Sequence, residues 1–231
     1  LKSITEQKNI KVDIIKKKKK NQKSVNTLVQ KYKTLKEEDP GTLSGALNIG
    51  VKKLKNKYDY FGWLGDDDLL YDSSLETTSK LLEKNPEAVI AYGGCDYIDS
   101  SGVKIYTNHS NKYASWVINW GPNIIPLPGM LYRAESLIKV GYFNTKLKYA
   151  MDLEMLLRLK KLGKFTYSDK TLAAFRWHPS STTVANRQNS LKEARMIKKQ
   201  FLPKYIKPIS ILWEAPVALA TNVVANRLNK M

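Results

Sequence analysis

The chain has 231 residues, of which 42% are hydrophobic and 26% are charged. These proportions exclude wholesale disorder and are typical of one globular domain, or of a domain with a small appendage. The formal net charge of +18 at pH 7 predicts an anionic partner such as nucleic acid, an acidic membrane surface or a phosphate-bearing substrate. Because the basic residues form neither an Arg-aromatic motif nor a zinc pattern, no nucleic acid is expected. A solvated basic surface stays open as the alternative.

Cys95 is the only cysteine, which excludes a disulfide within the chain and favours a reducing compartment. The chain opens on Leu1 without a visible signal peptide, so we expect a cytoplasmic protein and an N-terminally truncated sequence. The basic charge further suggests that the protein lies peripherally at the inner face of the cell membrane.

The first part of the chain predicts a short strand at residues 10–15, a helix at 25–35 and a second helix at 43–54. A run of five lysines at 16–20 follows the predicted strand directly, where a strand-to-helix loop is expected. Five adjacent ammonium groups cannot pack together, so they must be solvated or bound to anions.

An apolar and aromatic run at residues 60–64 predicts a buried strand that Gly65 ends. The three carboxylates of 66–68 then lie at the carboxyl end of the strand, where open α/β sheets bind ligands. Adjacent carboxylates raise one another's pKa unless a cation neutralises them, and hard oxygen ligands suit Mg²⁺ or Mn²⁺. The alternative is a solvated turn that precedes a helix capped by Asp72 or Ser73.

The rest of the chain alternates strand-like and helix-like segments. The predicted strands lie at 88–92, 103–106, 129–133 and within 165–175, and the predicted helices at 74–83, 152–161 and 186–201. No element is assigned to residues 107–125. This alternation predicts an α/β fold with a largely parallel sheet.

The tail at residues 206–231 has apolar residues at helical spacing, interrupted by Pro216. Glu214 and Asn222 make it a poor membrane-spanning helix. Such an amphipathic helical tail could lie in a membrane interface or pack onto the domain as its last helix, and the pattern leaves both open.

Five motifs, taken in chain order, resemble the family 2 nucleotide-sugar glycosyltransferases with the GT-A fold. They are Gly41-Thr-Leu-Ser-Gly-Ala-Leu-Asn-Ile-Gly50, Gly62-Trp-Leu-Gly-Asp-Asp-Asp68, Tyr92-Gly-Gly-Cys-Asp-Tyr-Ile-Asp-Ser-Ser-Gly102, Ala150-Met-Asp-Leu-Glu-Met-Leu-Leu-Arg158 and Phe175-Arg-Trp-His-Pro-Ser-Ser-Thr-Thr183. The resemblance implies a GT-A-like domain over 1–205, with a Rossmann-like, mostly parallel sheet flanked by helices. It also implies a donor and metal half at 1–95 and an acceptor half at 96–205.

The resemblance implies that Asp152 is the general base that removes the proton of the attacking acceptor hydroxyl. Met151 and Leu153 are apolar neighbours that would desolvate this carboxylate and raise its pKa. The structural alternative is an N-cap role for Asp152 at the start of its helix. Arg158 lies six residues further on, so it would lie on another face and serve as a structural ion-pair partner.

The resemblance implies further site residues around the nucleoside diphosphate sugar and a bound Mg²⁺ or Mn²⁺. They are Asn48, Asp66 and Arg176 for the donor and its diphosphate, and Asp67, Asp68 and His178 for the metal. Helix packing for Asn48 and a surface position for His178 are the structural alternatives.

Three features depart from the family pattern. The family's first strand, which carries a hydrophobic-Pro-x-Tyr/Phe-Asn motif, is missing before Leu1. The acidic loop that helps to hold the nucleoside is replaced by the lysine run at 16–20. Gly65 also stands where the first acid of the D-x-D element is expected.

The sequence therefore predicts a metal-dependent, inverting glycosyltransferase that extends a saccharide or lipid-linked acceptor in surface polysaccharide synthesis. The alternative is a catalytically inactive domain of the same fold that binds an anionic glycan, a membrane or a partner enzyme. A nucleic-acid-binding protein built on the lysine-rich start is the third hypothesis.

Overall fold

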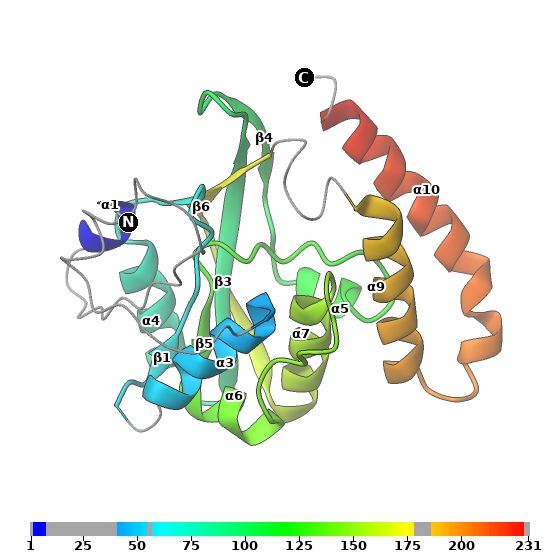
Figure 1. The fold of residues 1–231 in the computed structure, drawn as a ribbon, viewed down its shortest axis with the longest axis horizontal. Coiled ribbons are helices and arrows are strands. Elements are labelled where there is room, and N and C mark those ends of the chain that lie inside the picture. Colours follow the sequence, from blue (N-terminus) through cyan, green and yellow to red (C-terminus); the bar gives the residue numbers. More distant parts are fainter. Residues whose placement is uncertain (1, 8–40, 55–56, 178–185, 229–231) are drawn as a thin grey trace.

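The computed structural model of the chain describes residues 2–7, 41–54, 57–177 and 186–228 (Figure 1). The predicted strand at 10–15, the lysine run at 16–20, the predicted helix at 25–35 and His178 lie outside these residues.

A six-stranded sheet forms the centre of the fold. Its strands are β1 (Tyr60–Phe61), β2 (Leu69–Leu70), β3 (Ala88–Ile98), β4 (Lys104–Asn108), β5 (Leu131–Arg133) and β6 (Lys164–Arg176). The hydrogen-bonded order is β1-β5-β3-β6-β2, and β4 pairs with the last part of β3. The two long strands β3 and β6 therefore lie side by side in the middle (Figure 1).

The helices follow the strands along the chain. They are α1 (Lys2–Thr5), α3 (Leu43–Leu54), α4 (Ser74–Lys84), α5 (Ala114–Val117), α6 (Ala134–Val140), α7 (Met151–Leu162), α9 (Arg187–Phe201) and α10 (Ile211–Leu228), with a 3₁₀ helix η2 (Lys207–Ser210) before the last. The predicted helices at 43–54, 74–83, 152–161 and 186–201 are thus confirmed to within one or two residues.

The α/β class is confirmed, but the expected largely parallel sheet is not found in the described residues. There β3 and β6 pair in parallel, and the other pairings are antiparallel. Helix and strand spacing does not specify strand direction, and a tight connection reverses it. Between β3 and β4, Asp99 Oδ1 accepts hydrogen bonds from the amides of Ser101 (2.8 Å) and Val103 (2.9 Å), and this turn produces an antiparallel hairpin.

Helices cover both faces of the sheet, so β3 is buried almost throughout. In Figure 1, α4 lies on one side of β3 and β6, and α7 lies on the other. Ile90 and Tyr92 belong to the core cluster that includes α7, whereas Ala91 and Cys95 belong to the cluster that includes α4. This alternation is the two-residue period of a strand that is buried on both faces.

Strand β3 is longer than the predicted segment at 88–92 because two glycines allow it to continue beside β6. A Cβ atom on Gly93 would lie 2.5 Å from Leu172 Cδ1 and 2.9 Å from the Lys170 carbonyl oxygen. Only a residue without a side chain allows this close approach. Cys95 is fully buried here, as a small core residue.

The predicted strand at 60–64 is wrong in its length, since β1 ends at Phe61. Its partner β5 begins only at Leu131, two residues after Gly129 with φ +80°. The ladder between β1 and β5 has two residue pairs, Tyr60 with Arg133 and Phe61 with Tyr132. In the described part of the chain, residues 62–65 have no strand partner and lead to the turn formed by Asp66, Asp67 and Asp68, which we call the acidic turn.

The tail packs onto the domain as a last helix, which is one of the two predicted arrangements. Helices α9 and α10 lie next to each other in Figure 1, and Arg187 Nε donates to Asn222 Oδ1 across them (2.9 Å). Trp213 of α10 contacts Trp120 edge to face, with ring centroids 6.0 Å apart. Within the described residues, no helix has the length and apolarity that crossing a bilayer requires.

Candidate active site

The acidic turn joins the end of residues 62–65 to β2. Asp66 is exposed, whereas Asp68 is 8% exposed. Asp68 Oδ1 accepts a hydrogen bond from the backbone amide of Arg176 at the end of β6 (3.0 Å). Because β2 pairs with β6, the sheet itself holds this carboxylate in place.

Gly65 allows two carboxylates to converge. A Cβ atom on Gly65 would lie 2.7 Å from Asp68 Oδ2 and 2.9 Å from Asp67 Oδ1. A side chain at position 65 would therefore displace these oxygens. In this arrangement the departure from the family pattern at Gly65 leaves the space that Asp67 and Asp68 share.

The two carboxylates form an electrostatically costly pair. The pKa of Asp68 is raised to about 6: burial is the main cause, the Arg176 amide opposes it, and the charge of Asp67 adds to the rise. A cation placed between the two oxygens would offset both burial and repulsion. The residues therefore fit Mg²⁺ or Mn²⁺, which proteins hold through one or two carboxylates together with substrate phosphates.

The Arg176 guanidinium is directed at the backbone of two turns. Its Nε donates to the carbonyl oxygen of Asp67 (3.1 Å), and its Nη1 donates to those of Asp99 (2.7 Å) and Ser100 (3.0 Å). Arg176 thus ties the acidic turn to the turn between β3 and β4. In the described part of the chain Arg176 has this structural role, and the donor contact that the sequence predicts for it stays a prediction.

No group of three or more His, Cys, Asp or Glu side chains that could hold a metal ion occurs within residues 2–7, 41–54, 57–177 and 186–228. Asp67 and Asp68 are thus an incomplete metal site by themselves. The predicted third ligand, His178, lies outside the described residues, two positions after Arg176 at the end of β6.

Asp152 is the second residue of α7 and is partly buried. The N-cap position belongs to Ala150, so the N-cap alternative for Asp152 is wrong. Asn123 Nδ2 donates to Asp152 Oδ2 at 3.3 Å. Burial raises the pKa of Asp152, and the amides of Leu153 and Asp152 and the Asn123 side chain lower it. Met151 and Leu153 are buried neighbours, as the sequence predicts. The net result is a carboxylate with raised proton affinity.

Two buried polar atoms belong to the same part of the core. Among the residues that the structure describes, neither Trp63 Nε1 nor Tyr132 Oη has a hydrogen-bond partner at ordinary geometry, but the Trp63 side chain lies close enough to Tyr132 to lower its pKa. Trp63 packs against the core cluster that contains Tyr132 and Met151. Burial raises the pKa of Tyr132, and the charge of Asp152 raises it further. Trp63 lies between β1 and the acidic turn, so this cluster connects the chain near the acidic turn with the start of α7.

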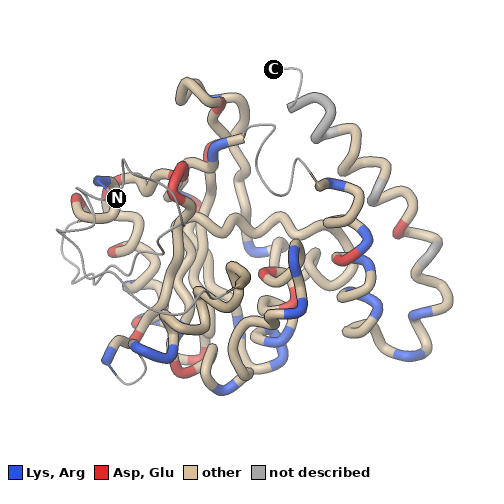
Figure 2. The backbone as a smooth tube through the Cα atoms, in the orientation of Figure 1, with Lys and Arg blue, Asp and Glu red and all other residues tan. Residues whose placement is uncertain are grey.

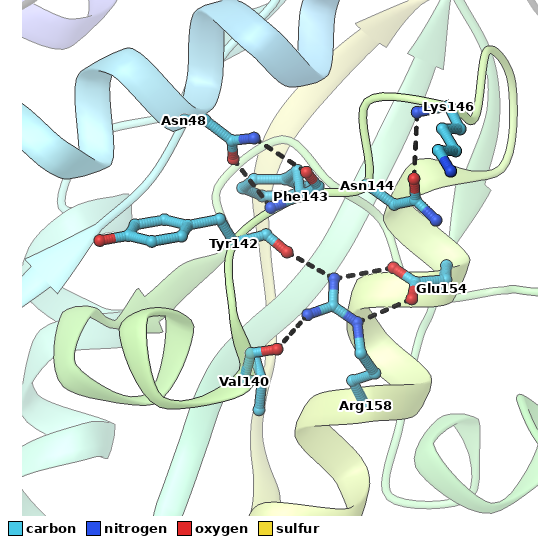
Figure 3. Close-up of polar contacts among 8 residues, drawn as sticks. All are labelled: Asn48, Val140, Tyr142, Phe143, Asn144, Lys146, Glu154 and Arg158. Carbon is cyan, nitrogen blue, oxygen red and sulfur yellow. Dashed lines mark hydrogen bonds and ion pairs between the residues drawn. The ribbon is translucent and has the colours of Figure 1, made fainter.

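Asn48 positions a loop through both atoms of its amide (Figure 3). Its Nδ2 donates to the carbonyl oxygen of Phe143 (2.8 Å), and its Oδ1 accepts from the amide of Phe143 (2.8 Å). This pair of bonds joins α3 to the segment between α6 and α7. The structural alternative thus accounts for Asn48, and we do not keep it in the proposed donor site.

Arg158 is a structural ion-pair partner, as predicted. Its Nε and Nη2 donate to the two oxygens of Glu154 at 2.7 and 2.8 Å. Its Nη1 and Nη2 also donate to the carbonyl oxygens of Val140 and Tyr142, both at 2.5 Å (Figure 3). Arg158 and Asn48 therefore hold the segment that leads into α7.

The sequence interpretation missed several residues of this site. Asn123 lies in the segment at 107–125 that has no clear period, and Trp63 and Tyr132 looked like ordinary core aromatics. Glu193, whose carboxylate accepts hydrogen bonds from three amides, lies in a lysine-rich helix, and no sequence pattern around it indicates this contact. Only their buried polar atoms, Trp63 Nε1 and Tyr132 Oη, distinguish these two residues from ordinary packing residues.

No family model matches the chain. Uncharacterized glycosyltransferases of Rickettsia typhi and Rickettsia prowazekii are each 27% identical to it over 184 residues, which cover 76% of this chain and 56% of the relative. A Rickettsia bellii protein of the same description is 25% identical over 200 residues, 83% of this chain and 28% of the relative. The chain thus spans a little over half the length of the first two curated relatives.

Solved structures confirm the fold. Residues 1–349 of S. aureus TarS align with a TM-score of 0.57 at 14% identity, over 87% of this chain and 64% of that one. The same TarS fragment in complex with UDP also aligns with a TM-score of 0.57, at 13% identity, over 89% and 65%. The described sheet and helices therefore have an α/β fold similar to that of TarS.

Proposed function

We propose that this protein is a family 2 glycosyltransferase with the GT-A fold that transfers a sugar from a nucleoside diphosphate donor to a saccharide or lipid-linked acceptor. The observation that carries the proposal is Asp152, a partly buried carboxylate of raised pKa at the start of α7, in a fold similar to that of TarS. The names of the curated relatives support the same class. The pathway proposed is surface polysaccharide synthesis.

In this proposal Asp152 is the general base. Its carboxylate accepts the proton of the acceptor hydroxyl, whose oxygen forms the bond to the anomeric carbon as the bond to the donor diphosphate breaks. Attack opposite the leaving diphosphate inverts the configuration at that carbon. Asn123 orients the carboxylate through its hydrogen bond to Oδ2, and burial raises its proton affinity, which favours a role as a base.

Asp67 and Asp68 would hold Mg²⁺ or Mn²⁺, with His178 as the proposed third ligand and exposed Asp66 facing the donor. The metal would supply positive charge to the departing diphosphate. The support is the convergence of Asp67 Oδ1 and Asp68 Oδ2 beside Gly65 and the raised pKa of Asp68. Arg176 would hold the turn in shape through its bond to the Asp67 carbonyl.

The proposal predicts separate effects for the two ends of the site. Asp67→Asn should weaken Mn²⁺-dependent binding of a nucleoside diphosphate about tenfold or more, because one charged ligand is lost. Asp152→Asn should keep donor binding and lower turnover by about 10² to 10⁴, because the proton acceptor is lost. Calorimetric titration with UDP, GDP and CDP, followed by transfer assays, measures both effects. Asp72→Asn, at an exposed position, is the control.

An inactive domain of the same fold is the alternative function. It would bind an anionic glycan or a partner without nucleotide dependence. Wild-type protein that binds no nucleoside diphosphate with Mn²⁺ present would favour this alternative and end the enzyme proposal. Nucleotide binding without loss of turnover in Asp152→Asn would leave a transferase with a different base.

We also propose a peripheral contact with an anionic membrane, on the side of α10 that points away from α9. Leu212 and Leu219 on this side are 74% and 67% exposed, and Val223 is 45% exposed. The polar residues Asn222 and Glu214 instead have partners: Arg187 contacts Asn222, and Lys199 lies 3.8 Å from Glu214. An apolar helix face near basic residues is typical of interfacial helices, and the inner face of the cell membrane is the proposed place.

A further inference from the structure

Glu193 of α9 binds the segment that leads into α7. Its Oε1 accepts a hydrogen bond from the amide of Lys148 at 3.0 Å, and its Oε2 accepts from the amides of Tyr149 and Ala150 at 2.5 and 2.6 Å. One carboxylate from a distant helix thus satisfies three consecutive amides. The sequence separation is 43 to 45 residues, so only the tertiary fold creates this contact.

The contact lies just before α7 and involves the amides of residues 148–150 rather than the first amides of the helix itself. The first amides of a helix have no partner within it, and a side-chain oxygen at the N-cap commonly accepts from them. Ala150 is the N-cap of α7 and has no such oxygen. Glu193 supplies an external carboxylate to the amides just before the helix, where a negative charge also interacts favourably with the helix dipole. The backbone two residues before Asp152 is thereby fixed.

The same carboxylate acts on Asp152 through its charge. Burial raises the pKa of Asp152 most, and the negative charge of Glu193 raises it further. Among the described residues, Tyr132 of β5 is a further titratable group that interacts with Asp152, and Asn123 contributes a neutral amide. Lys198, five residues further along α9, donates to the carbonyl oxygen of Gly121, two residues before Asn123. Helix α9 therefore contacts both segments that surround Asp152.

We propose that Glu193 is a positioning residue for Asp152, which holds the start of α7 through three amides and places a second negative charge next to the base. The inference rests on the proposed function only in naming Asp152 as the base. It assigns to α9 a part in catalysis that the sequence does not indicate. A purely structural contact would fix the loop without changing the proton affinity of Asp152.

The test is a titration of the Asp152 carboxyl carbon by NMR in wild-type protein and in Glu193→Gln. The Gln side chain keeps an oxygen that can accept from the amides but loses the charge. We expect the Asp152 midpoint to move to lower pH, because a like charge that opposes ionisation is gone. Glu76→Gln is the charge-matched control. Glu76 pairs with Lys80 on α4, on the other side of β3 and β6 in Figure 1, so its loss should leave the midpoint unchanged.

Glu193→Asp separates the two parts of the role. The shorter side chain keeps the charge but cannot reach all three amides, so hydrogen exchange at Tyr149 and Ala150 should become faster while the Asp152 midpoint stays near the wild-type value. In transfer assays Glu193→Gln should move the acidic limb of the kcat profile to lower pH. Glu193→Asp should instead lower kcat several-fold without moving that limb.

The outcomes distinguish this inference from the proposed function. An unchanged Asp152 midpoint in Glu193→Gln, with Glu193→Asp exchanging like wild type, overturns the positioning role whatever the activity. A shifted midpoint together with full turnover in Asp152→Asn supports the coupling of Glu193 to Asp152 and overturns the assignment of Asp152 as the base. Because the titration needs no substrate, it is decisive even if the acceptor is not yet identified.

Discussion

Two carboxylates on the first turn of α7 illustrate how surroundings assign a role to a residue. Glu154 is 8% exposed, and both of its oxygens accept hydrogen bonds from Arg158. Asp152 lies two residues earlier, and its side-chain hydrogen bond comes from the neutral amide of Asn123. A carboxylate whose two oxygens are paired with Arg serves the structure through its ion pair, whereas a buried one without a cation is available for proton transfer.

This contrast predicts opposite effects of removing the two charges. Glu154→Gln should lower the free energy of unfolding by about 2 to 4 kcal/mol, because it leaves a half-buried guanidinium without its counter-ion. Asp152→Asn should be neutral or stabilising at pH 7, since the folded state no longer carries a desolvated charge. Denaturant unfolding of both variants measures the difference. Equal destabilisation by the two substitutions would contradict the distinction.

The effect of Asp152 should depend on pH with a definite sign. Its folded-state pKa is raised above the ordinary value of 3.8, so the unfolded chain loses this proton first as the pH rises. The contribution of Asp152 to stability is then fully present below about pH 4 and is lost as the pH rises through the folded-state pKa. The stability of Asp152→Asn relative to wild type should therefore increase from pH 4 upward, which unfolding curves at several pH values would measure.

At the scale of elements, the parallel pair of β3 and β6 organises the molecule. The pairing runs from Ala88 with Lys164 to Ile98 with Arg176, and the helices pack onto its two faces. It starts at Gly163, where a Cβ atom would lie 2.6 Å from Val89 Cγ1 and 2.7 Å from the Glu87 carbonyl oxygen. The carbonyl oxygen of Glu87 accepts a hydrogen bond from the amide of Lys164. The connection from α7 to β6 therefore lies directly against the start of β3.

Gly163→Ala should therefore destabilise the protein by about 1 to 3 kcal/mol, because the added methyl group meets backbone that cannot move without breaking the strand pairing. The matched control is Gly50→Ala in α3. There the nearest atom to the added Cβ would be Phe61 Cε2 at 3.7 Å, and alanine is the better helix former by about 1 kcal/mol. We expect the control to be neutral or stabilising. Thermal unfolding of the two variants under the same conditions is the measurement.

At the scale of the whole molecule, charge and apolar surface lie on neighbouring parts of one side. Figure 2 shows Lys and Arg gathered along α9 and at its junction with α10, where Lys204 and Lys207 are exposed. The exposed apolar residues Leu212 and Leu219 follow on α10. In the membrane proposal, the Lys and Arg residues of this side would draw it to an anionic lipid surface, and the leucines would enter the interface.

Membrane binding is therefore expected to need both contributions. Wild-type protein should sediment with vesicles that contain phosphatidylserine, and binding should weaken in high salt. The double variant Leu212→Glu and Leu219→Glu should bind the vesicles at least about tenfold more weakly than wild type, since two apolar side chains no longer enter the interface. The control is Gln188→Glu with Gln200→Glu, which makes the same charge change at exposed positions of α9. If both double variants lose binding equally, charge alone explains the contact and the leucines do not insert.

The sequence by itself determined the α/β class, most helix positions and the acidic turn, and its resemblance to a known family suggested Asp152 as a candidate base. Local periodicity and turn residues carry that information, because each depends on neighbours within a few positions. The predicted ion-pair role of Arg158 also came from helical spacing, though its partners at Val140 and Tyr142 did not.

Only the tertiary structure decided the direction of the strands, the length of β1 and the partners of the site residues. Strand direction depends on how connections return, and β1 ends where its pairing with β5 ends, at Phe61 and Tyr132. Glu193 contacts amides more than 40 residues away, and Asn48 binds Phe143 across 95 positions. Such contacts depend on packing between elements that are far apart in the chain, and no local pattern contains them.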